Sequence, residues 1–247
     1  MKTSSTSQGV ISAYDVEHSH LKGHMIRGKN LYPFSAALVA VWDTLAACLN
    51  LKRNNLSVQF DNVYFYSQPI LHRKYQLRPY VTIQMGSGRF EVSNEKSLLV
   101  TGTIIPEIRS DREVHNPPDI IEANVSGDDI YELLCGKEYN YLEDFRSIHS
   151  TNESMTEAQI EWNGNWVTFL DGIIQLNVLK RKHNTISKLN LIRKIVIDVE
   201  KQSNATVVKD GKVVANAKIL DLYDLTVCGG VVMESLRFVD LPLQKND

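Results

Sequence analysis

The chain has 247 residues and a formal net charge of −2, enough for one large domain or two small ones with hydrophobic cores. The near balance of charge gives no electrostatic argument for nucleic-acid binding. No run approaches the ~20 apolar residues of a membrane span, so we expect no membrane partner. The N-terminus lacks an apolar signal core, and the cysteines (Cys48, Cys135, Cys228) form no disulfide or zinc pattern. Both features predict a cytoplasmic protein.

The first half of the chain predicts one buried helix followed by strands. The helix is expected over residues 33–49, opening with proline in its first turn. It is apolar nearly all round, which is typical of a buried helix. Strand-like runs follow, with a Gly86-Ser87-Gly88 turn among them, at residues 56–60, 63–66, 80–85, 89–93 and 98–105.

The second half repeats this order. A polar, proline-bearing linker over residues 109–124 leads to a short helix at 128–134. A second buried helix over 166–179 then precedes strand-like runs at 189–199, 205–209, 212–220, 222–227 and 231–239. A buried helix followed by an antiparallel meander, twice over, predicts an α+β fold of two sheets that each wrap a helix.

The first candidate site is the motif His24-x3-Gly28-x4-Pro33, which runs directly into the first helix. Histidine exchanges a proton near neutral pH. The helix N-terminus offers free N–H groups that would stabilise a thioester carbonyl as it gains negative charge. Gly28 lets a ligand approach the backbone closely, and Pro33 fixes the chain direction into the helix.

Two other interpretations of His24 stay open. His18, His20 and His24 form an H-x-H-x3-H cluster that could hold zinc, although zinc would want a further ligand and an ordered shell. Each of these histidines could also be a solvated loop residue.

The second candidate site is Asp171-x3-Gln175, inside the second apolar helix. A carboxyl group is costly in apolar surroundings, and burial raises its pKa, which suits a general acid at neutral pH. Gln175 lies one turn on, on the same face, where its amide can orient the carboxyl. The alternative is a core aspartate that is merely satisfied by hydrogen bonds.

Together these motifs resemble the dehydratase domains of animal, insect-like fatty acid synthases and of modular polyketide synthases. The resemblance covers roughly residues 14–240. It is carried also by the sequences around the motifs, which run Gly23-His24-Met25-Ile26-Arg27-Gly28, Val39-Ala40-Val41-Trp42, Phe60-Asp61-Asn62-Val63-Tyr64-Phe65 and Asn165-Trp166-Val167-Thr168-Phe169-Leu170-Asp171.

The resemblance implies a double hotdog fold, with a polar tail at 1–13, an N-terminal hotdog at 14–108, a linker at 109–124 and a C-terminal hotdog at 125–241. It implies dehydration of (3R)-3-hydroxyacyl chains on acyl carrier protein to trans-2-enoyl chains. His24 would take the α-proton, Asp171 would protonate the departing hydroxyl and Gln175 would orient Asp171. Gly28 and the backbone up to Pro33 would face the thioester. No cofactor or metal is expected.

The implied partners are the phosphopantetheine-linked acyl chain on its carrier protein and other fatty acid synthase domains. A homodimer with a second copy of the chain is left open. The basic run at residues 180–183, with Lys188, Arg193 and Lys194, is a candidate surface for an acidic carrier protein. The alternative is a solvated helix end, where cations are favoured by the helix dipole.

The chain departs from the family in two places. The family's Gly-Tyr-x-Tyr-Gly-Pro-x-Phe motif reads Glu138-Tyr139-Asn140-Tyr141-Leu142-Glu143-Asp144-Phe145 here. Tyr139 and Tyr141 are retained as candidate substrate-binding residues, but glutamates and a leucine replace two glycines and a proline, so the turn is expected to differ. Phe34 follows Pro33 where smaller residues are usual, which predicts a narrower pocket.

Two further functions compete with the dehydratase. A catalytically degenerate dehydratase-like domain with a structural or dimerising role is favoured by the altered segment at 138–145 and opposed by the retained His24, Asp171 and Gln175. A hotdog thioesterase would consume water rather than release it, and no residue points to it specifically.

Overall fold

The structure, a computed structural model, describes residues 4–9, 11, 16–72, 76–107, 123–181 and 185–242. Most of the predicted linker lies outside these residues. Within the segment predicted as a polar tail, residues Ser5–Gln8 form the strand β1, which pairs with β5. In the N-terminal half, five strands lie in the order β1-β5-β6-β7-β4 around one helix, α1 (Phe34–Cys48). Their bounds are β1 Ser5–Gln8, β4 Val58–Phe65, β5 Tyr80–Ile83, β6 Arg89–Ser93 and β7 Leu98–Pro106.

The C-terminal half repeats the arrangement around α3 (Trp166–Lys180). Its strands lie in the order β11-β15-β14-β13-β10-β9-β8, with β12 paired to β13. Their bounds are β8 Val125–Ser126, β9 Ile148–Thr151, β10 Glu157–Glu161, β11 Ile186–Ile197, β12 Thr206–Lys209, β13 Lys212–Leu220, β14 Leu225–Cys228 and β15 Val231–Leu241. Two further helices are α2 (Gly127–Gly136) and α4 (Val199–Asn204).

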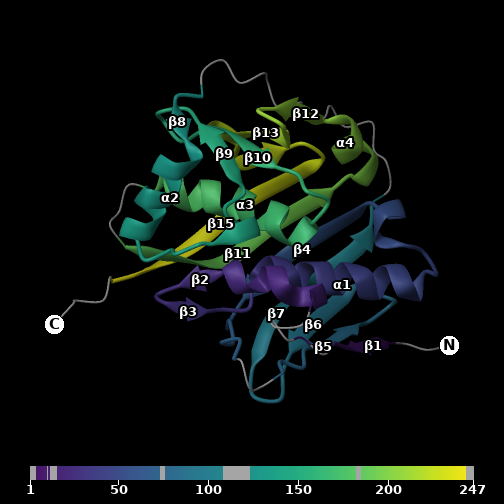
Figure 1. Ribbon diagram of the computed structural model, residues 1–247. Helices are drawn as coiled ribbons and strands as arrows, with labels where there is room; N and C mark the ends of the chain where they lie inside the picture. The colour runs from purple at the N-terminus through teal and green to yellow at the C-terminus, as the bar shows by residue number, and fades with distance from the viewer. Residues whose placement is uncertain are drawn as a thin grey trace.

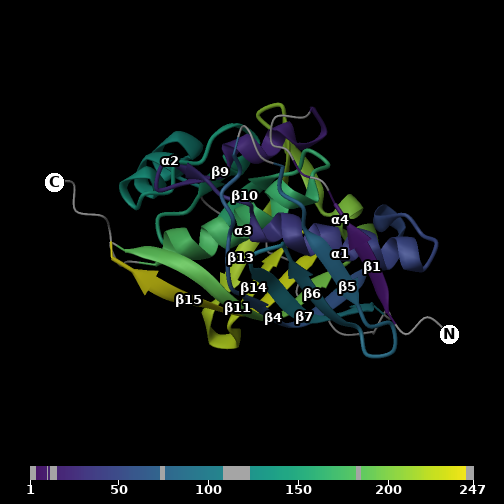
Figure 2. The ribbon, with the colours of Figure 1, turned by 90° about the horizontal axis from the view of Figure 1, so that it is seen from below.

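The sheets of the two halves join edge to edge through β4 and β11. The pairing is antiparallel and runs from Leu191 opposite Tyr64 to Ile197 opposite Val58. Figure 2 shows the strands from β15 through β11 and β4 to β5 following one another along one curved sheet beneath the two helices. Figure 1 shows the N-terminal half below the C-terminal half, with α1 and α3 as their central helices.

The two central helices are buried because their sequences are apolar on every side. Thirteen residues of α3 and eleven of α1 are buried, so packing of the whole surface, not one amphipathic face, stabilises each helix. The helices also contact each other. The rings of Trp42 on α1 and Trp166 on α3 meet edge to face at 5.1 Å, a favourable aromatic geometry. The double hotdog predicted from the sequence is confirmed.

Short elements carry the remaining described chain. Two-residue strands β2 (Met25–Ile26) and β3 (Lys29–Asn30) form a separate hairpin. Four 3-10 helices are η1 (Val16–Gly23), η2 (Arg53–Asn55), η3 (Glu143–Phe145) and η4 (Asp221–Tyr223).

Several predicted boundaries were wrong for identifiable reasons. The strands expected at 56–60 and 63–66 are one strand, β4, in which Asn62 adopts a left-handed conformation (φ 50) and the pairing register with β7 shifts, as in a β-bulge. Residue 199 begins α4 instead of ending a strand, because the Asp198 side chain accepts a hydrogen bond from the Lys201 N–H and caps a helix.

Candidate active site

His24 lies on a segment that is held by the opposite half of the molecule. Backbone hydrogen bonds run from Leu142 N to Gly23 O (2.9 Å), from Asn140 N to Met25 O (2.8 Å) and from Arg27 N to Glu138 O (2.8 Å). These bonds make residues 23–27 and 138–142 an antiparallel pair. The position of His24 therefore depends on the Tyr139–Tyr141 segment of the C-terminal half.

The Nδ1 atom of His24 lies 2.8 Å from the backbone oxygen of Leu31. A carbonyl oxygen only accepts hydrogen bonds, so Nδ1 carries the proton. In the neutral ring the lone pair is then on Nε2, which lies 3.6 Å from Oδ1 of Asp171. This tautomer presents Nε2 as a base toward the carboxyl group.

Asp171 is on the buried α3 helix, which the Asn165 side chain caps through the Val167 N–H. Its Oδ2 accepts a hydrogen bond of 2.7 Å from Nε2 of Gln175. The same amide nitrogen also donates to the backbone oxygen of Phe145 at 2.9 Å. The predicted role of Gln175 as a partner of Asp171 thus has a direct geometric basis, while Oδ1 remains directed at His24.

Both groups are almost completely buried, at 2% exposure for His24 and 4% for Asp171. Burial lowers the pKa of His24, opposed by the attraction of Asp171 and the bond to Leu31. Burial raises the pKa of Asp171, opposed by His24, by Gln175 and by the neighbouring Ser35 hydroxyl, which has no well-formed hydrogen bond of its own. Both shifts favour a neutral imidazole beside a protonated carboxyl, the state in which one is a base and the other an acid.

The altered segment at 138–145 still places its aromatic rings against His24. The ring centroids of Tyr141 and Phe145 lie 5.6 and 5.1 Å from that of the imidazole. Tyr139 accepts from the N–H of Ser187 and donates to its carbonyl, and burial raises its pKa to about 12. All three rings are buried and help to exclude water from the imidazole.

The left-handed conformations in this segment fall on the two glutamates. Glu138 has φ 65 and Glu143 has φ 49, whereas Leu142 is extended at φ −130. Leucine at this position thus avoids the left-handed conformation that a glycine could adopt at low cost. Glu138 offsets its conformational cost with an ion pair of 2.8 Å to Arg27.

An apolar cavity of about 140 Å³ opens onto the imidazole and the carboxyl. Apolar side chains from both halves line it, namely Ile26, Leu31, Phe34, Ile174, Val178, Ile186, Leu189, Phe238 and Leu241, with Tyr139 and Tyr141 beside them. Polar side chains are few (Arg27, Gln68, Ser187 and Lys188). Such a lining accepts an aliphatic chain and strengthens electrostatic interactions at its polar end.

Two predicted binding residues are not part of the cavity lining. Gly28 is at the turn of the β2–β3 hairpin, where Arg27 (φ 53) and Gly28 (φ 65) both adopt positive φ, as a two-residue type I′ turn requires. Pro33 is the N-cap residue of α1, not its first helical residue. Their neighbours Arg27 and Phe34 line the cavity instead, and a role in thioester binding stays a prediction.

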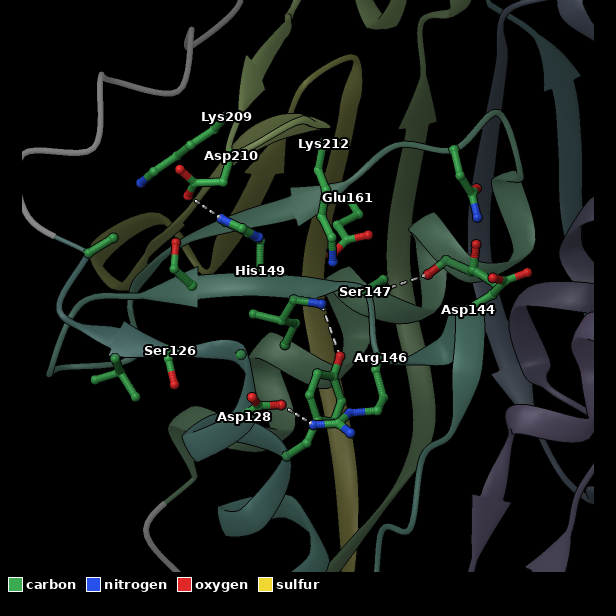
Figure 3. Close-up of a pocket in the computed structure, with 18 of the residues that line it drawn as sticks. Ser126, Asp128, Asp144, Arg146, Ser147, His149, Glu161, Lys209, Asp210 and Lys212 are labelled. Carbon is green, nitrogen blue, oxygen red and sulfur yellow. Dashed lines mark hydrogen bonds and ion pairs between the residues drawn. The ribbon is translucent and has the colours of Figure 1, made fainter.

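A larger cleft of about 640 Å³ lies elsewhere, over α2 and the ends of β9, β10 and β13 (Figure 3). Charged side chains line it, and they are paired with one another: Arg146 with Asp128, His149 with Asp210, and Lys212 with Glu161. This local pairing reduces the charge that the cleft offers to a ligand. The smaller cavity, which contains the perturbed acid and base, is the better candidate for catalysis.

Within the described part of the chain, no group of three or more His, Cys, Asp or Glu side chains is placed to hold a metal ion. No helix among the same residues has the length and apolar character needed to cross a bilayer.

The basic surface predicted for a carrier protein is largely paired with carboxylates. Lys180 contacts Asp221, Arg181 makes a two-pronged pair with Asp240, and Arg193 lies 3.5 Å from Glu234. Residues 182 and 183 lie outside the described part of the chain. The pairing reduces the positive potential that this surface offers to an acidic partner.

Sequence reasoning missed three contributors to the site. The backbone oxygens of Leu31 and Phe145 fix the orientations of His24 and Gln175, and backbone atoms carry no sequence signal. Tyr131, on α2, donates a hydrogen bond to Gln175. Its only signal is a tyrosine among the apolar positions of a short helix.

Comparison with solved structures gives matches over nearly the whole chain. The dehydratase domain from the CurF module of curacin polyketide synthase has a TM-score of 0.75 at 15% identity, covering 98% of this chain and 95% of that chain. The dehydratase domain of a mycocerosic acid synthase-like polyketide synthase has a TM-score of 0.69 at 12% identity, covering 97% and 92%. A trans-AT polyketide synthase dehydratase domain from Brevibacillus brevis gives 0.67 at 12% identity, covering 98% and 95%.

Two further matches are inactive mutants of the CurK dehydratase, each 13% identical to this chain. One, with asparagine in place of an aspartate, has a TM-score of 0.72 and covers 98% of this chain and 95% of that chain. The other, with phenylalanine in place of a histidine, has a TM-score of 0.71 and covers 98% and 94%. No protein-family model matches the sequence. At these identities the likeness establishes the fold, and the chain has the double hotdog fold of these dehydratase domains.

Proposed function

We propose that this protein dehydrates (3R)-3-hydroxyacyl chains carried on acyl carrier protein to trans-2-enoyl chains, as a step of fatty acid synthesis. The observation that carries the proposal is the geometry of the buried pair: His24 Nε2 lies 3.6 Å from Oδ1 of Asp171, while Nδ1 is bonded to the Leu31 oxygen. A 3.6 Å separation is longer than a normal N–H···O hydrogen bond. It leaves the two atoms free to act on neighbouring positions of one substrate.

In the proposed reaction His24 Nε2 takes the α-proton while Asp171 gives its proton to the β-hydroxyl. The C–O bond breaks, the Cα–Cβ double bond forms and water leaves. The pair ends as imidazolium and carboxylate, and a proton returned from His24 to Asp171 restores the starting state. The buried surroundings favour that return, because they destabilise both charged groups.

We also propose that the two halves, residues 14–108 and 125–241, contribute one group each, with the site between them. His24 precedes α1, and Asp171 is on α3. The acyl chain would occupy the apolar cavity, and the phosphopantetheine arm would pass Arg27, Gln68 and Lys188. The inactive asparagine and phenylalanine mutants of CurK dehydratase support the assignment, since they replace the same two residue types.

The test is turnover of a 3-hydroxybutyryl thioester, on N-acetylcysteamine and on carrier protein, followed by absorbance of the enoyl thioester. A general acid or base contributes ~10²–10⁴-fold, so His24→Ala and Asp171→Asn should each lose at least about a hundredfold in kcat. Glu95→Gln, an exposed change outside the site, is the matched control and should keep the parent rate. Equal rates in all four proteins would exclude the mechanism.

The degenerate, structural role remains the second candidate, because two glutamates replace a glycine and a proline in the segment that holds His24. Absence of turnover by the parent on carrier-bound substrate would favour this role.

A further inference from the structure

Tyr131 lies behind the catalytic pair and does not line its cavity. It is on α2 and is 6% exposed. Its hydroxyl accepts a hydrogen bond of 2.9 Å from the N–H of Ile148 and lies 2.8 Å from Oε1 of Gln175 and 3.3 Å from the backbone oxygen of Phe145. A phenol has one proton to donate, and the shorter distance assigns it to Gln175.

This hydroxyl decides which end of the Gln175 amide faces Asp171. With Oε1 bonded to Tyr131, the amide nitrogen donates to Asp171 Oδ2 at 2.7 Å and to Phe145 O at 2.9 Å. Both N–H groups and the oxygen of the amide are then satisfied. Turning the amide over would place its oxygen against the carbonyl oxygen of Phe145, and two acceptors in contact repel each other.

The orientation of the amide in turn places the acidic proton of Asp171. Because Oδ2 accepts from Gln175, the proton of the neutral carboxyl belongs on Oδ1, the oxygen directed toward His24. A turned amide would present its oxygen to Oδ2, and the carboxyl proton would then sit on Oδ2 and donate a hydrogen bond to that oxygen. The acid would then point away from the substrate and into the protein.

We propose that Tyr131 is a positioning residue that locks the Gln175 amide and so keeps the acidic proton of Asp171 on Oδ1. The inference rests on the proposed dehydration. Tyr131 acts through Gln175 and touches no reacting atom.

The outer face of the Tyr131 ring is held independently of the site. Tyr131 is also one of the residues that line the larger polar cleft over α2. The Arg146 guanidinium lies 5.0 Å from the centroid of the Tyr131 ring. It also donates a hydrogen bond of 2.8 Å to Asp128, which is on α2 like Tyr131. The Arg146 cation packs over the ring, and the Ile148 N–H binds the hydroxyl, so both parts of the phenol are held in place.

The first test is a double-mutant cycle of Tyr131→Phe, Gln175→Met and the two together, with kcat measured on the 3-hydroxybutyryl thioester. Tyr131→Phe alone should lower kcat about tenfold, as expected for loss of one buried hydrogen bond, with KM unchanged. In the Gln175→Met background the same change should have no further effect. Thr226→Val, which removes a hydrogen bond to Asn177 elsewhere on α3, is the matched control and should keep the parent kcat.

The second test is the pH dependence. The titratable groups facing Asp171 are His24, Tyr131 and Tyr141, and burial raises the pKa of both tyrosines far above the working range. Donation from Gln175 lowers the pKa of Asp171. Tyr131→Phe should weaken that donation, so the alkaline limb of kcat should move to higher pH. Loss of packing alone would reduce the rate without moving the limb.

The third readout needs no turnover. The ¹³C-carboxyl resonance of Asp171, identified by its absence in Asp171→Asn, should titrate at higher pH in Tyr131→Phe than in the parent. An unmoved titration together with additive kcat effects in an active enzyme would overturn the role of Tyr131 and leave the proposed function intact. The opposite outcome is also informative. If Tyr131→Phe shifts the titration of Asp171 but the parent shows no turnover, the dehydration is refuted, while the role of Tyr131 in orienting Gln175 stands.

Discussion

Asp171→Asn should stabilise the protein while abolishing its activity. Burial raises the pKa of the carboxyl above 3.8, so between pH 3.8 and the raised value the folded state holds a proton that the unfolded state has released. Over that window the parent loses about 1.4 kcal/mol of stability for each pH unit of increase. The asparagine side chain is neutral at every pH of the window and can still accept the hydrogen bond from Gln175. The variant therefore avoids this loss of stability.

The free energy of unfolding should therefore differ between variant and parent by an amount that grows with pH. His24 reinforces the trend. Its pKa is lowered by burial and held up in part by Asp171. Removing that attraction makes the variant slightly less stable in acid, where a neutral buried histidine must be charged.

The assay is urea unfolding of both proteins at several pH values between about 5 and 8, with Glu95→Gln as the baseline. A difference that stays constant with pH, or that shrinks as pH rises, would mean that Asp171 is ionised in the folded protein. Such a result would refute a protonated Asp171 in the folded protein.

Three other changes test the packing around the site. Glu143→Gly should stabilise the protein by about 1 kcal/mol in urea unfolding, because glycine removes the cost of φ 49; a loss of stability would contradict this. Gly172→Ala should cost ~1–3 kcal/mol and lower kcat, because its Cβ would lie 2.4 Å from the Ser147 Oγ atom. Gly136→Ala, with no atom within 4 Å, is the control and should be neutral or slightly stabilising. Phe34→Leu should raise kcat/KM for a 3-hydroxydecanoyl thioester relative to a 3-hydroxybutyryl thioester by about tenfold. The reason is that the cavity of 140 Å³ holds only about five water-sized units of ~30 Å³ each, which suits a short acyl chain. An unchanged ratio would show that Phe34 does not limit chain length.

The regular elements were predictable where local pattern and tertiary structure agree. The strands β6 and β13 match their predicted ranges, since their alternating or apolar residues lie between clear turns. Both central helices were predicted to within a residue or so at their ends. The strands β9 and β10 were missed, because polar residues such as Ser150 and Gln159 are buried there and satisfy each other at 3.1 Å. A pairing of that kind between two strands is invisible in either strand alone.

The candidate site was predictable only in its side chains. His24 stands out by its spacing to Gly28 and Pro33 before an apolar helix. Asp171 and Gln175 stand out because they interrupt one, and the structure brings the three side chains together. The cavity wall could not be predicted, since it depends on how the hairpin at Arg27 and the loop at Glu138 meet. Their ion pair joins residues 111 positions apart, and no local pattern encodes such a contact.

The continuous ladder between β4 and β11 has a consequence for how such a protein can be divided. If the halves were expressed separately, each would expose the unpaired backbone N–H and C=O groups along one edge of a long strand, and such an edge is a template for aggregation. Each would also carry one member of the proposed acid–base pair without its counterpart. Keeping both halves on one polypeptide enforces a one-to-one ratio of the proposed base to the proposed acid. It also lets each half evolve its own lining, which a symmetric pair of identical subunits could not do.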